Sequence, residues 1–326
     1  MREAFFDLTG ALQPALHTNE VLLCELAAER SDFVRFNRGR VRQPGSVDQR
    51  FLTLRLVRER RQAYATLAIG GGREDVEQAR AVIARLRDTL AQLPEDPWLL
   101  LAETPHSTTS ERRGKLAPAE SVAQQVVAGA NGSDLVGIYA AGTIYRGFAN
   151  SYGQRNWHEI DSFNLDWSLH LEADKAVKAA YAGFDWQETA FAAKLESATT
   201  QLALLGVPRR TIGPGEYRAY LTPRALEELA GMICWGGFSA RSRATRQSAL
   251  LRMEHGETLA PGVTLRESTA DGVAPQFQDE GFVKPPSVTL IDGGRLGDPL
   301  VSPRSAKEYG LTTNAANAGE SPESLD

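Results

Sequence analysis

Long apolar runs, cysteines and histidines are scarce in this sequence of 326 residues. It has no run of eighteen apolar residues, and its short N-terminal apolar patch lies between Glu3 and Asp7. We therefore expect neither a membrane span nor a secretory signal. The two cysteines, Cys24 and Cys234, lie in apolar stretches, which favours buried free thiols over a disulfide. Together these absences favour the cytoplasm.

The composition is that of a folded globular protein, with 42% hydrophobic and 24% charged residues. The length favours two domains. Proline and glycine cluster from Gly206 to Gly215, between an expected helix and a new strand-like run. We place the boundary there and predict an N-terminal domain over residues 1–208 and a C-terminal domain over residues 209–326.

The first half of the chain mixes helical and strand-like patterns. We expect a short helix over residues 19–30 because its apolar residues form a broad face. Alternating apolar residues then predict three strands with a tight turn near Glu59, over residues 33–41, 51–58 and 62–69. An apolar stripe predicts a helix from Asp75 to a point before Pro94, and another is expected over residues 118–129.

Residues 134–170 have the texture of a β-meander, with a break expected at Gly142. Residues 172–205 are expected to be helical, interrupted near Gly183 and restarted by a capping box at Asp185. Beyond the boundary we expect a helix from Pro223 to about Ile233 and short strands over residues 217–221, 263–267, 281–284 and 288–292. The fold class is therefore α+β, with an antiparallel sheet and helices in the first domain and a mainly β, truncated second domain.

An arginine-rich stretch, Arg35–Arg61, is the most conspicuous charged feature. Nucleic-acid binding needs basic residues gathered on one face, preferably beside aromatic rings. Strand alternation instead places Arg35 and Arg55 on one side and sends Arg38, Arg40, Arg42 and Arg58 to the other. We interpret the stretch as solvated strand edges and turns, where basic residues also discourage edge-to-edge pairing.

The residue types that carry chemistry do not form an assembled site in the sequence. The run Gly70–Gly72 matches no phosphate-binding motif and is followed by two acids. The sequence His158-Glu159 lacks a second histidine one helical turn later, and we interpret His158 and His170 as strand histidines. Asp279 and Glu280 are adjacent on a turn, where side chains point apart, so we favour an acidic turn over a catalytic pair.

Four segments nevertheless resemble the TldD/TldE (PmbA) family of metallopeptidase-related proteins, in the family's order. They are SDFVRFNRGRVRQ with the strands FLTLRLV and AYATLAI, then GIYAAGTIYRGFANSYGQ, then GPGEYRAYLTPRALEEL, and finally FQDEGFVKPPSVTLIDGGRLGDPLVSPRSAKEYGLTTNAANAG. The resemblance covers nearly the whole chain. It implies a two-domain cytoplasmic dimer whose internal cavity admits unstructured peptides.

In the TldD type of this family, a helix carries HExxxH, whose histidines bind zinc and whose glutamate is the general base. A cysteine near the C-terminus is a further ligand. Aligned on that helix, this chain has Thr222 and Pro223 in place of the first histidine and the glutamate, and Glu227 in place of the second histidine. The resemblance is therefore to the TldE type. It implies no catalytic residue and no metal site in this chain.

The resemblance leads to a primary hypothesis and two alternatives. We expect the non-metal-binding subunit of a zinc peptidase complex, with zinc in a TldD-like partner and with Thr222, Glu227 and Glu228 lining the peptide cavity. The partner is a TldD-like subunit or a second copy, the substrate is an unstructured peptide, and neither nucleic acid nor a membrane is expected. The alternatives are a binding module of the DNA-gyrase-modulator type and a hydrolase using Asp279 or Glu280. Relatives of this kind continue further, so we expect the chain to be a fragment.

Overall fold

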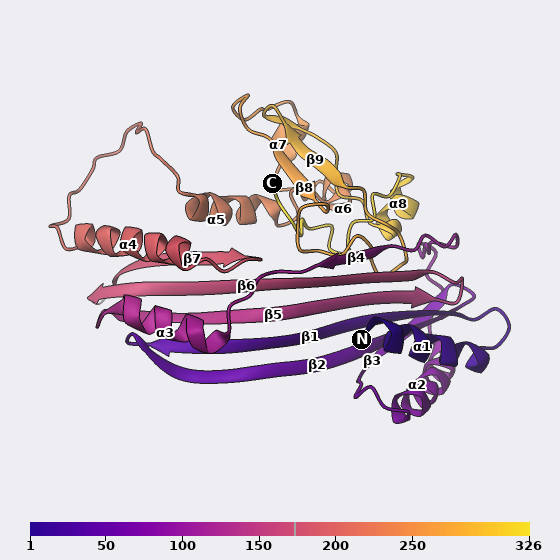
Figure 1. The fold of residues 1–326 in the computed structure, drawn as a ribbon. Helices are drawn as coiled ribbons and strands as arrows, with labels where there is room; N and C mark the ends of the chain where they lie inside the picture. Colours follow the sequence, from indigo (N-terminus) through magenta and orange to yellow (C-terminus); the bar gives the residue numbers. More distant parts are fainter. Residues whose placement is uncertain (173) are drawn as a thin grey trace.

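One long, largely antiparallel sheet organises the computed structural model, which describes residues 1–172 and 174–326 (Figure 1). Its strand order is β3-β2-β1-β5-β6-β4, and β7 also pairs with β6. The strands are β1 (Val21–Asn37), β2 (Arg40–Arg58), β3 (Arg61–Ala68), β4 (Thr109–Arg112), β5 (Asp134–Asn150), β6 (Arg155–Glu172) and β7 (Lys175–Gly183). Among the strands that the structure describes, β4 alone runs parallel to its neighbour in this sheet. The predicted α+β class is confirmed.

Helices cover one face of this sheet in two groups, α1 (Arg2–Leu12) with α2 (Glu74–Leu90) at one end and α3 (Ala119–Ala130) with α4 (Glu188–Leu205) at the other. A short 3₁₀ turn, η1 (Gln13–Ala15), follows α1. The helices expected after Asp75 and Pro118 are confirmed as α2 and α3. Among the described residues, none of the helices combines the length and apolar character needed to cross a membrane.

The C-terminal part packs around a small sheet of order β10-β9-β8. It contains α5 (Pro223–Cys234), α6 (Ala240–Ala244), α7 (Leu251–Glu254), β8 (Leu265–Ser268), β9 (Ser287–Asp292), β10 (Arg295–Leu296) and α8 (Pro303–Tyr309). The helix expected at Pro223 is confirmed. The strand expected over residues 217–221 is wrong because those residues are exposed and irregular, and residues 281–284 contribute only an isolated bridge between Phe277 and Val283.

The helix predicted over residues 19–30 is also wrong, because these residues begin the central strand β1. Leu22, Cys24 and Leu26 point to the helical layer. Leu23, which lies between them, packs on the other face against Phe277 of the C-terminal part. Both faces are covered here, so the apolar residues run almost continuously and imitate a helical face.

Two further expectations are wrong, one about a break at Gly142 and one about a helix that begins at residue 172. Gly142 lies within β5 rather than at a turn, and a Cβ atom at this position would stand 2.2 Å from the carbonyl oxygen of Arg30. Glycine is needed there because the β1 and β5 backbones approach closely. Residues 175–183 form β7 instead of a helix, and Asp185 does not cap α4 because its carboxylate accepts a hydrogen bond from the Lys115 amide at 2.8 Å.

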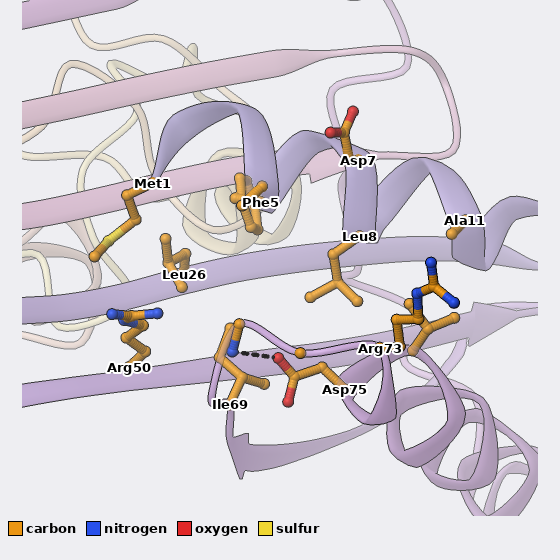
Figure 2. Close-up of a pocket in the computed structure, with 14 residues that line it drawn as sticks. Met1, Phe5, Asp7, Leu8, Ala11, Leu26, Arg50, Ile69, Arg73 and Asp75 are labelled. Atoms are coloured by element: carbon orange, nitrogen blue, oxygen red, sulfur yellow. Dashed lines mark hydrogen bonds between the residues drawn. The ribbon is translucent and has the colours of Figure 1, made fainter.

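The glycine run before α2 is closed by a carboxylate of the same chain (Figure 2). Asp75 accepts hydrogen bonds from the amides of Gly70, at 3.1 Å, and Gly71, at 2.6 Å. Asp75 itself lies in the first turn of α2, which begins at Glu74. The amides that a phosphate would need are thus occupied, which supports a structural connection between β3 and α2.

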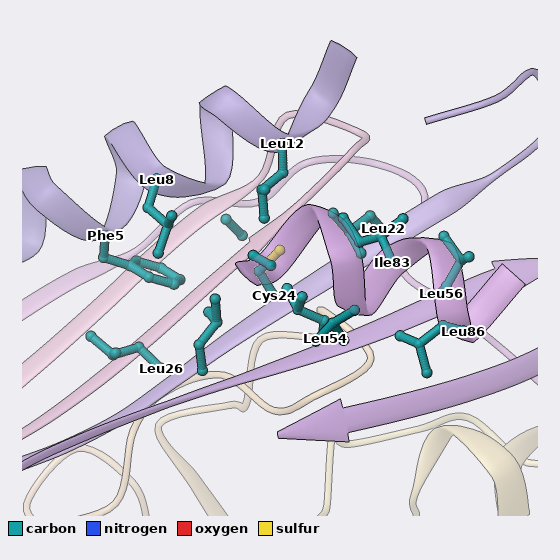
Figure 3. Packing of buried hydrophobic residues seen from close by; sticks show 14 of the residues in the cluster. Phe5, Leu8, Leu12, Leu22, Cys24, Leu26, Leu54, Leu56, Ile83 and Leu86 are labelled. Atoms are coloured by element: carbon teal, nitrogen blue, oxygen red, sulfur yellow. The ribbon is translucent and has the colours of Figure 1, made fainter. Parts of the chain in front are cut away.

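The principal core lies between β1, β2, α1 and α2 (Figure 3). Leu22, Leu54, Leu56 and Ile83 are almost completely buried there. Cys24 is buried in the same cluster, and burial raises the pKa of its thiol far above the ordinary value. Its prediction as a buried free thiol is confirmed. A reactive thiolate is therefore not available at this position.

Candidate functional site

The positions aligned with the family's metal helix lie at the start of α5. Thr222 is the N-cap, and its hydroxyl accepts a hydrogen bond from the Ala225 amide at 3.2 Å. Glu227 pairs with Arg224 at 2.7 Å, and Glu228 pairs with the same guanidinium at 3.2 Å. The oxygen atoms of this helix start are therefore used to cap the helix and to pair with an arginine.

A cavity of about 340 Å³ lies beside these residues, between β7, α4 and the start of α5. Thr222, Arg224 and Glu227 line it together with Lys178 and Lys194. Glu228 is not among the residues that line the cavity, although it pairs with Arg224, which does line it. The geometry thus brings together two of the three predicted cavity residues, while their role toward a peptide stays a prediction.

These residues do not fit a zinc ion. Thr222 is committed as a helix cap, Pro223 has no side-chain donor, and Glu227 is paired with a cation. In residues 1–172 and 174–326, His, Cys, Asp and Glu side chains nowhere gather in a group of three or more that could hold a metal ion. Zinc usually takes three or four nitrogen, sulfur or carboxylate ligands, which α5 does not offer.

The adjacent acids Asp279 and Glu280 converge on one guanidinium, contrary to the expectation that they point apart. Arg55 on β2 donates to Asp279 at 2.6 Å and to Glu280 at 3.1 Å. Glu25 on β1 lies 3.7 Å from the same guanidinium. We call Arg55, Glu25, Asp279 and Glu280 the charge cluster. It joins the large sheet to the loop before Gly281.

Three carboxylates around one guanidinium leave excess negative charge in a mostly buried place. Burial, followed by the charge of Asp279, raises the pKa of Glu25 to about 7, although Arg55 opposes the shift. The same two causes raise the pKa of Glu280 to about 7. Arg55 itself has a raised pKa because the three nearby carboxylates outweigh its burial. Raised carboxyl pKa values of this kind often mark functional sites.

A polar cleft of about 260 Å³ opens beside the charge cluster. We call it the β1–β5 cleft, because Glu25 on β1 and Arg146 on β5 form its floor. The C-terminal part contributes Phe277, Asp279 and Lys284, and Thr53 of β2 and Phe148 of β5 also line the cleft. Sequence reasoning did not find this cleft, since its residues are separated by up to three hundred positions.

The histidines do not form a site. His158 lies buried on β6, and one ring nitrogen is 3.1 Å from the carbonyl oxygen of Val273. Burial lowers its pKa. His170 lies on the same strand, so the interpretation of both as strand histidines is confirmed.

The arginine-rich stretch is divided by the fold into two settings. Arg55 is largely buried in the charge cluster, with 14% of its side chain exposed. At the opposite end of β1 and β2, a group that we call the arginine hairpin end comprises Arg35, Arg38, Arg40 and Arg42. In the described part of the chain these four side chains have no salt bridge.

An apolar hollow of about 410 Å³ lies between α1 and the glycine run (Figure 2). Phe5, Leu8 and Ile69 line it. Two of the polar side chains that line it are engaged, since Arg50 donates to the Gly70 carbonyl at 3.2 Å and Asp75 accepts hydrogen bonds from the Gly70 and Gly71 amides. It therefore offers an apolar surface without an assembled catalytic group.

Comparison with known proteins supports the resemblance seen in the sequence. Residues 214–324 match the family described as PmbA/TldA metallopeptidase C-terminal domain. No curated protein sequence matches the chain. TldE from Thermococcus kodakarensis is similar in structure, with 14% identity and a TM-score of 0.70, over 96% of this chain and 73% of that one.

Two similar structures are described as candidate modulators of DNA gyrase. The protein from Thermotoga maritima has 14% identity and a TM-score of 0.75, over 98% of this chain and 76% of that one. The protein from Bacteroides thetaiotaomicron has the same identity and TM-score, over 99% and 76%. At this identity the likeness establishes a shared fold. The domain match of residues 214–324 and the fold shared over nearly the whole chain confirm the resemblance to the TldD/TldE (PmbA) family.

Proposed function

We propose that this chain is the non-metal-binding subunit of a cytoplasmic, TldD/TldE-like zinc peptidase complex that acts on unstructured peptides. Its partner would be a TldD-like subunit, or a second copy in a homodimer. The partner would supply the zinc, which activates water for attack on a peptide bond. This chain would shape the cavity and hold the peptide.

The observation that carries the proposal is the chemistry of α5. Where the TldD type has two histidines and a glutamate, this chain has a capping threonine, a proline and a glutamate paired with Arg224. Thr222 and Glu227 still face a cavity. We expect a non-metal-binding subunit to have such a helix, which lies beside a cavity but offers no set of metal ligands.

An extensive exposed apolar surface supports the need for a partner. From the last turn of α4 to the residue after α5, large apolar side chains are exposed to a degree unusual for a protein that remains a monomer. Trp235 is 89% exposed, Tyr220 86% and Met232 70%. The others in this stretch are Leu204, Leu205, Val207, Ile212, Tyr217, Leu221, Leu226 and Leu229.

Co-expression with a TldD-like homologue tests the assignment. We expect a stable heterodimer on size-exclusion chromatography, one zinc per pair by elemental analysis, and cleavage of an unstructured peptide such as β-casein fragments only by the pair. Stoichiometric zinc on this chain alone, together with peptide cleavage, would overturn the proposal.

Variants on the exposed face of α5 locate the interface. The double change Leu226→Glu and Met232→Glu places two charges on the exposed apolar surface and should abolish pairing while the chain keeps its circular dichroism spectrum. Arg218→Gln is the control, since this exposed residue lies in the same segment but is polar. If both variants paired equally well with the partner, the interface would lie on another surface of the chain.

The second candidate function is a binding module of the DNA-gyrase-modulator type, favoured by the arginine hairpin end. Four arginines without an acidic partner in the described residues form a concentrated positive charge. Such a charge would bind a polyanion with strong salt dependence. If this candidate holds, changing Arg38, Arg40 and Arg42 together to alanine will weaken duplex DNA binding at 50 mM salt and reduce its salt slope.

A control variant that loses the same charge elsewhere distinguishes a DNA-binding site at the arginine hairpin end from non-specific electrostatic attraction. Changing Arg209, Arg210 and Arg218 to alanine removes the same charge from the exposed segment before α5. Equal loss of binding in both triple variants, or no binding by the unchanged chain, would remove this candidate.

A further inference from the structure

The charge cluster contains one carboxylate that is not needed to hold Arg55. Asp279 and Glu280 both hydrogen-bond to that guanidinium, at 2.6 and 3.1 Å. Glu25 stands 3.7 Å away, which is too far for a hydrogen bond. Its Oε1 atom is buried and has no hydrogen-bond partner within the described chain. Glu25 is therefore a surplus acceptor at the edge of the cluster, and it lines the β1–β5 cleft.

The cleft also contains a guanidinium that forms no salt bridge with the residues that the structure describes. Arg146 on β5 is half-buried, and burial lowers its pKa, although the charge of Glu29 opposes the shift. Among the described residues its hydrogen bonds come from Nη1 alone, and both acceptors are backbone carbonyls, of Tyr145 at 2.9 Å and Ala28 at 3.4 Å. Within residues 1–172 and 174–326 it forms no salt bridge. The remaining nitrogen atoms can donate to a carboxylate.

The sheet register places these two groups close together on one face. Glu25 pairs with Phe148, and Ala27 pairs with Arg146. Glu25 and Arg146 are therefore diagonal neighbours on adjacent strands, a relation that puts Cβ atoms about 7 Å apart. Side chains of this length can bring a carboxylate and a guanidinium to the two ends of one small molecule.

The walls of the cleft restrict the size and character of that molecule. The volume of about 260 Å³ is below the roughly 300–1,000 Å³ of pockets for drug-sized ligands. Phe148, Pro275 and Phe277 supply an apolar wall. Lys284 is already paired with Glu323, so Arg146 is the cation available to a ligand. The space suits a compact ligand with one apolar group.

We propose that the β1–β5 cleft binds a small zwitterion with an apolar side chain, an α-amino acid whose ammonium contacts Glu25 and whose carboxylate contacts Arg146. Asp279 adds a second carboxylate near the ammonium, and the phenylalanine rings pack against the side chain. The acids alone would be a structural ion-pair network. The free guanidinium and the cleft beside them are what make a ligand site. The site lies on this chain and requires neither zinc nor a partner subunit, so it stands apart from the proposed peptidase complex.

Isothermal titration calorimetry on the full chain with three related probes tests both ionic contacts. L-leucine has both charges, leucinamide lacks the carboxylate, and N-acetyl-L-leucine lacks the ammonium. We expect leucine to bind with a Kd of about 1 mM or tighter. Each analogue should bind at least ten times more weakly, because one buried charge of the cleft is then left unmatched. No saturable binding of leucine, or equal binding of all three probes, would overturn the proposal.

Matched variants assign each contact. Arg146→Gln should bind leucine and leucinamide with equal, weak affinity, whereas Glu25→Gln should bind leucine and N-acetyl-L-leucine alike. Arg35→Gln is the control, because Arg35 lies on the same sheet face but far from the cleft, opposite Ile138. It should leave leucine binding unchanged. If the Arg146 variant does not fold, the three probes on the unchanged chain still decide the outcome. Wild-type selectivity in either cleft variant would contradict the assignment.

Discussion

Two glutamates five residues apart show opposite responses to burial. Glu20, just before β1, has no exposed side-chain surface, yet its pKa is lowered, first by the hydrogen bonds from Arg87. Those bonds measure 2.7 and 2.8 Å, and the His17 amide adds a third at 2.9 Å. The Glu25 side chain is 31% exposed and accepts no hydrogen bond from the residues that the structure describes, and its burial, followed by the charge of Asp279, raises its pKa to about 7. For Glu20 the hydrogen bonds to the charged form outweigh burial, whereas for Glu25 burial is not offset.

Removing Glu20, the carboxylate that is fully hydrogen-bonded, should cause the largest loss of stability. In the Glu20→Ala variant, Arg87 loses both of its hydrogen bonds to the Glu20 carboxylate. We expect the free energy of unfolding, measured by urea titration at pH 7, to fall by about 3 kcal/mol. The pKa of Glu20 is lower in the folded state than its ordinary value of 4.5. Ionised Glu20 therefore stabilises the fold above pH 4.5, and this stabilisation is lost as the pH falls through the lowered pKa. The difference between wild type and variant should shrink in that acid range.

The exposed Glu196 on α4 provides the control for this comparison. Glu196→Ala should change stability by less than about 0.5 kcal/mol. If both variants lost the same free energy of unfolding, the Glu20–Arg87 pair would not stabilise the fold more than an exposed glutamate does.

Removing the guanidinium of the charge cluster should have an intermediate, pH-dependent effect. Arg55→Met keeps a long side chain but leaves Glu25, Asp279 and Glu280 without their common cation. We expect a loss of about 2 kcal/mol at pH 8, where the carboxylates are ionised. At pH 6 the loss should be smaller, because the raised pKa values of Glu25 and Glu280 allow them to take up protons. An equal loss at both pH values would contradict this account.

Neutralising the surplus carboxylate should have the smallest effect, in the opposite direction. A raised carboxyl pKa means that the folded state binds more protons than the unfolded state between about pH 4.5 and 7, so ionised Glu25 destabilises the fold above that window. The shift corresponds to at most a few kcal/mol. Because the side chain is 31% exposed, we expect Glu25→Gln to gain only about 1 kcal/mol at pH 8 and nothing at pH 4.5. A loss of stability at pH 8 would show that Arg55 needs all three acids.

The spacing of apolar residues was sufficient to predict the helices and strands that bury only one face. The stripe of α2, including Val82, Ile83 and Leu86, predicted that helix, and the alternation of Leu52, Leu54 and Leu56 predicted the strand they occupy. The pattern failed at residues 19–30, where the C-terminal part covers the second face of β1. It failed again at Gly142, where a close approach of two strands, and not a turn, requires glycine.

The candidate sites depended on contacts that a single sequence does not reveal. The chemistry of α5 could be anticipated, because Thr222, Pro223 and Glu227 lie close together in sequence, at the N-cap and in the first turns of one helix, and their donor atoms follow from residue type. The charge cluster could not, since 224 positions separate Arg55 from Asp279. Adjacent acids on a turn usually diverge, and only tertiary structure places one guanidinium between them.

The central place of β1 also has a consequence for the order of folding. A two-residue turn joins it to β2, whereas its pairing with β5 joins Phe36 to Gly137 and Leu23 to Asn150, more than a hundred residues away. Closing so long a loop costs conformational entropy before any contact repays it. We expect the β1–β2 ribbon to gain amide protection before β5 does, and pulse-labelled hydrogen exchange would detect the order. Simultaneous protection of both would point to a nucleus that already contains β5, in which the first half of the chain folds as one unit.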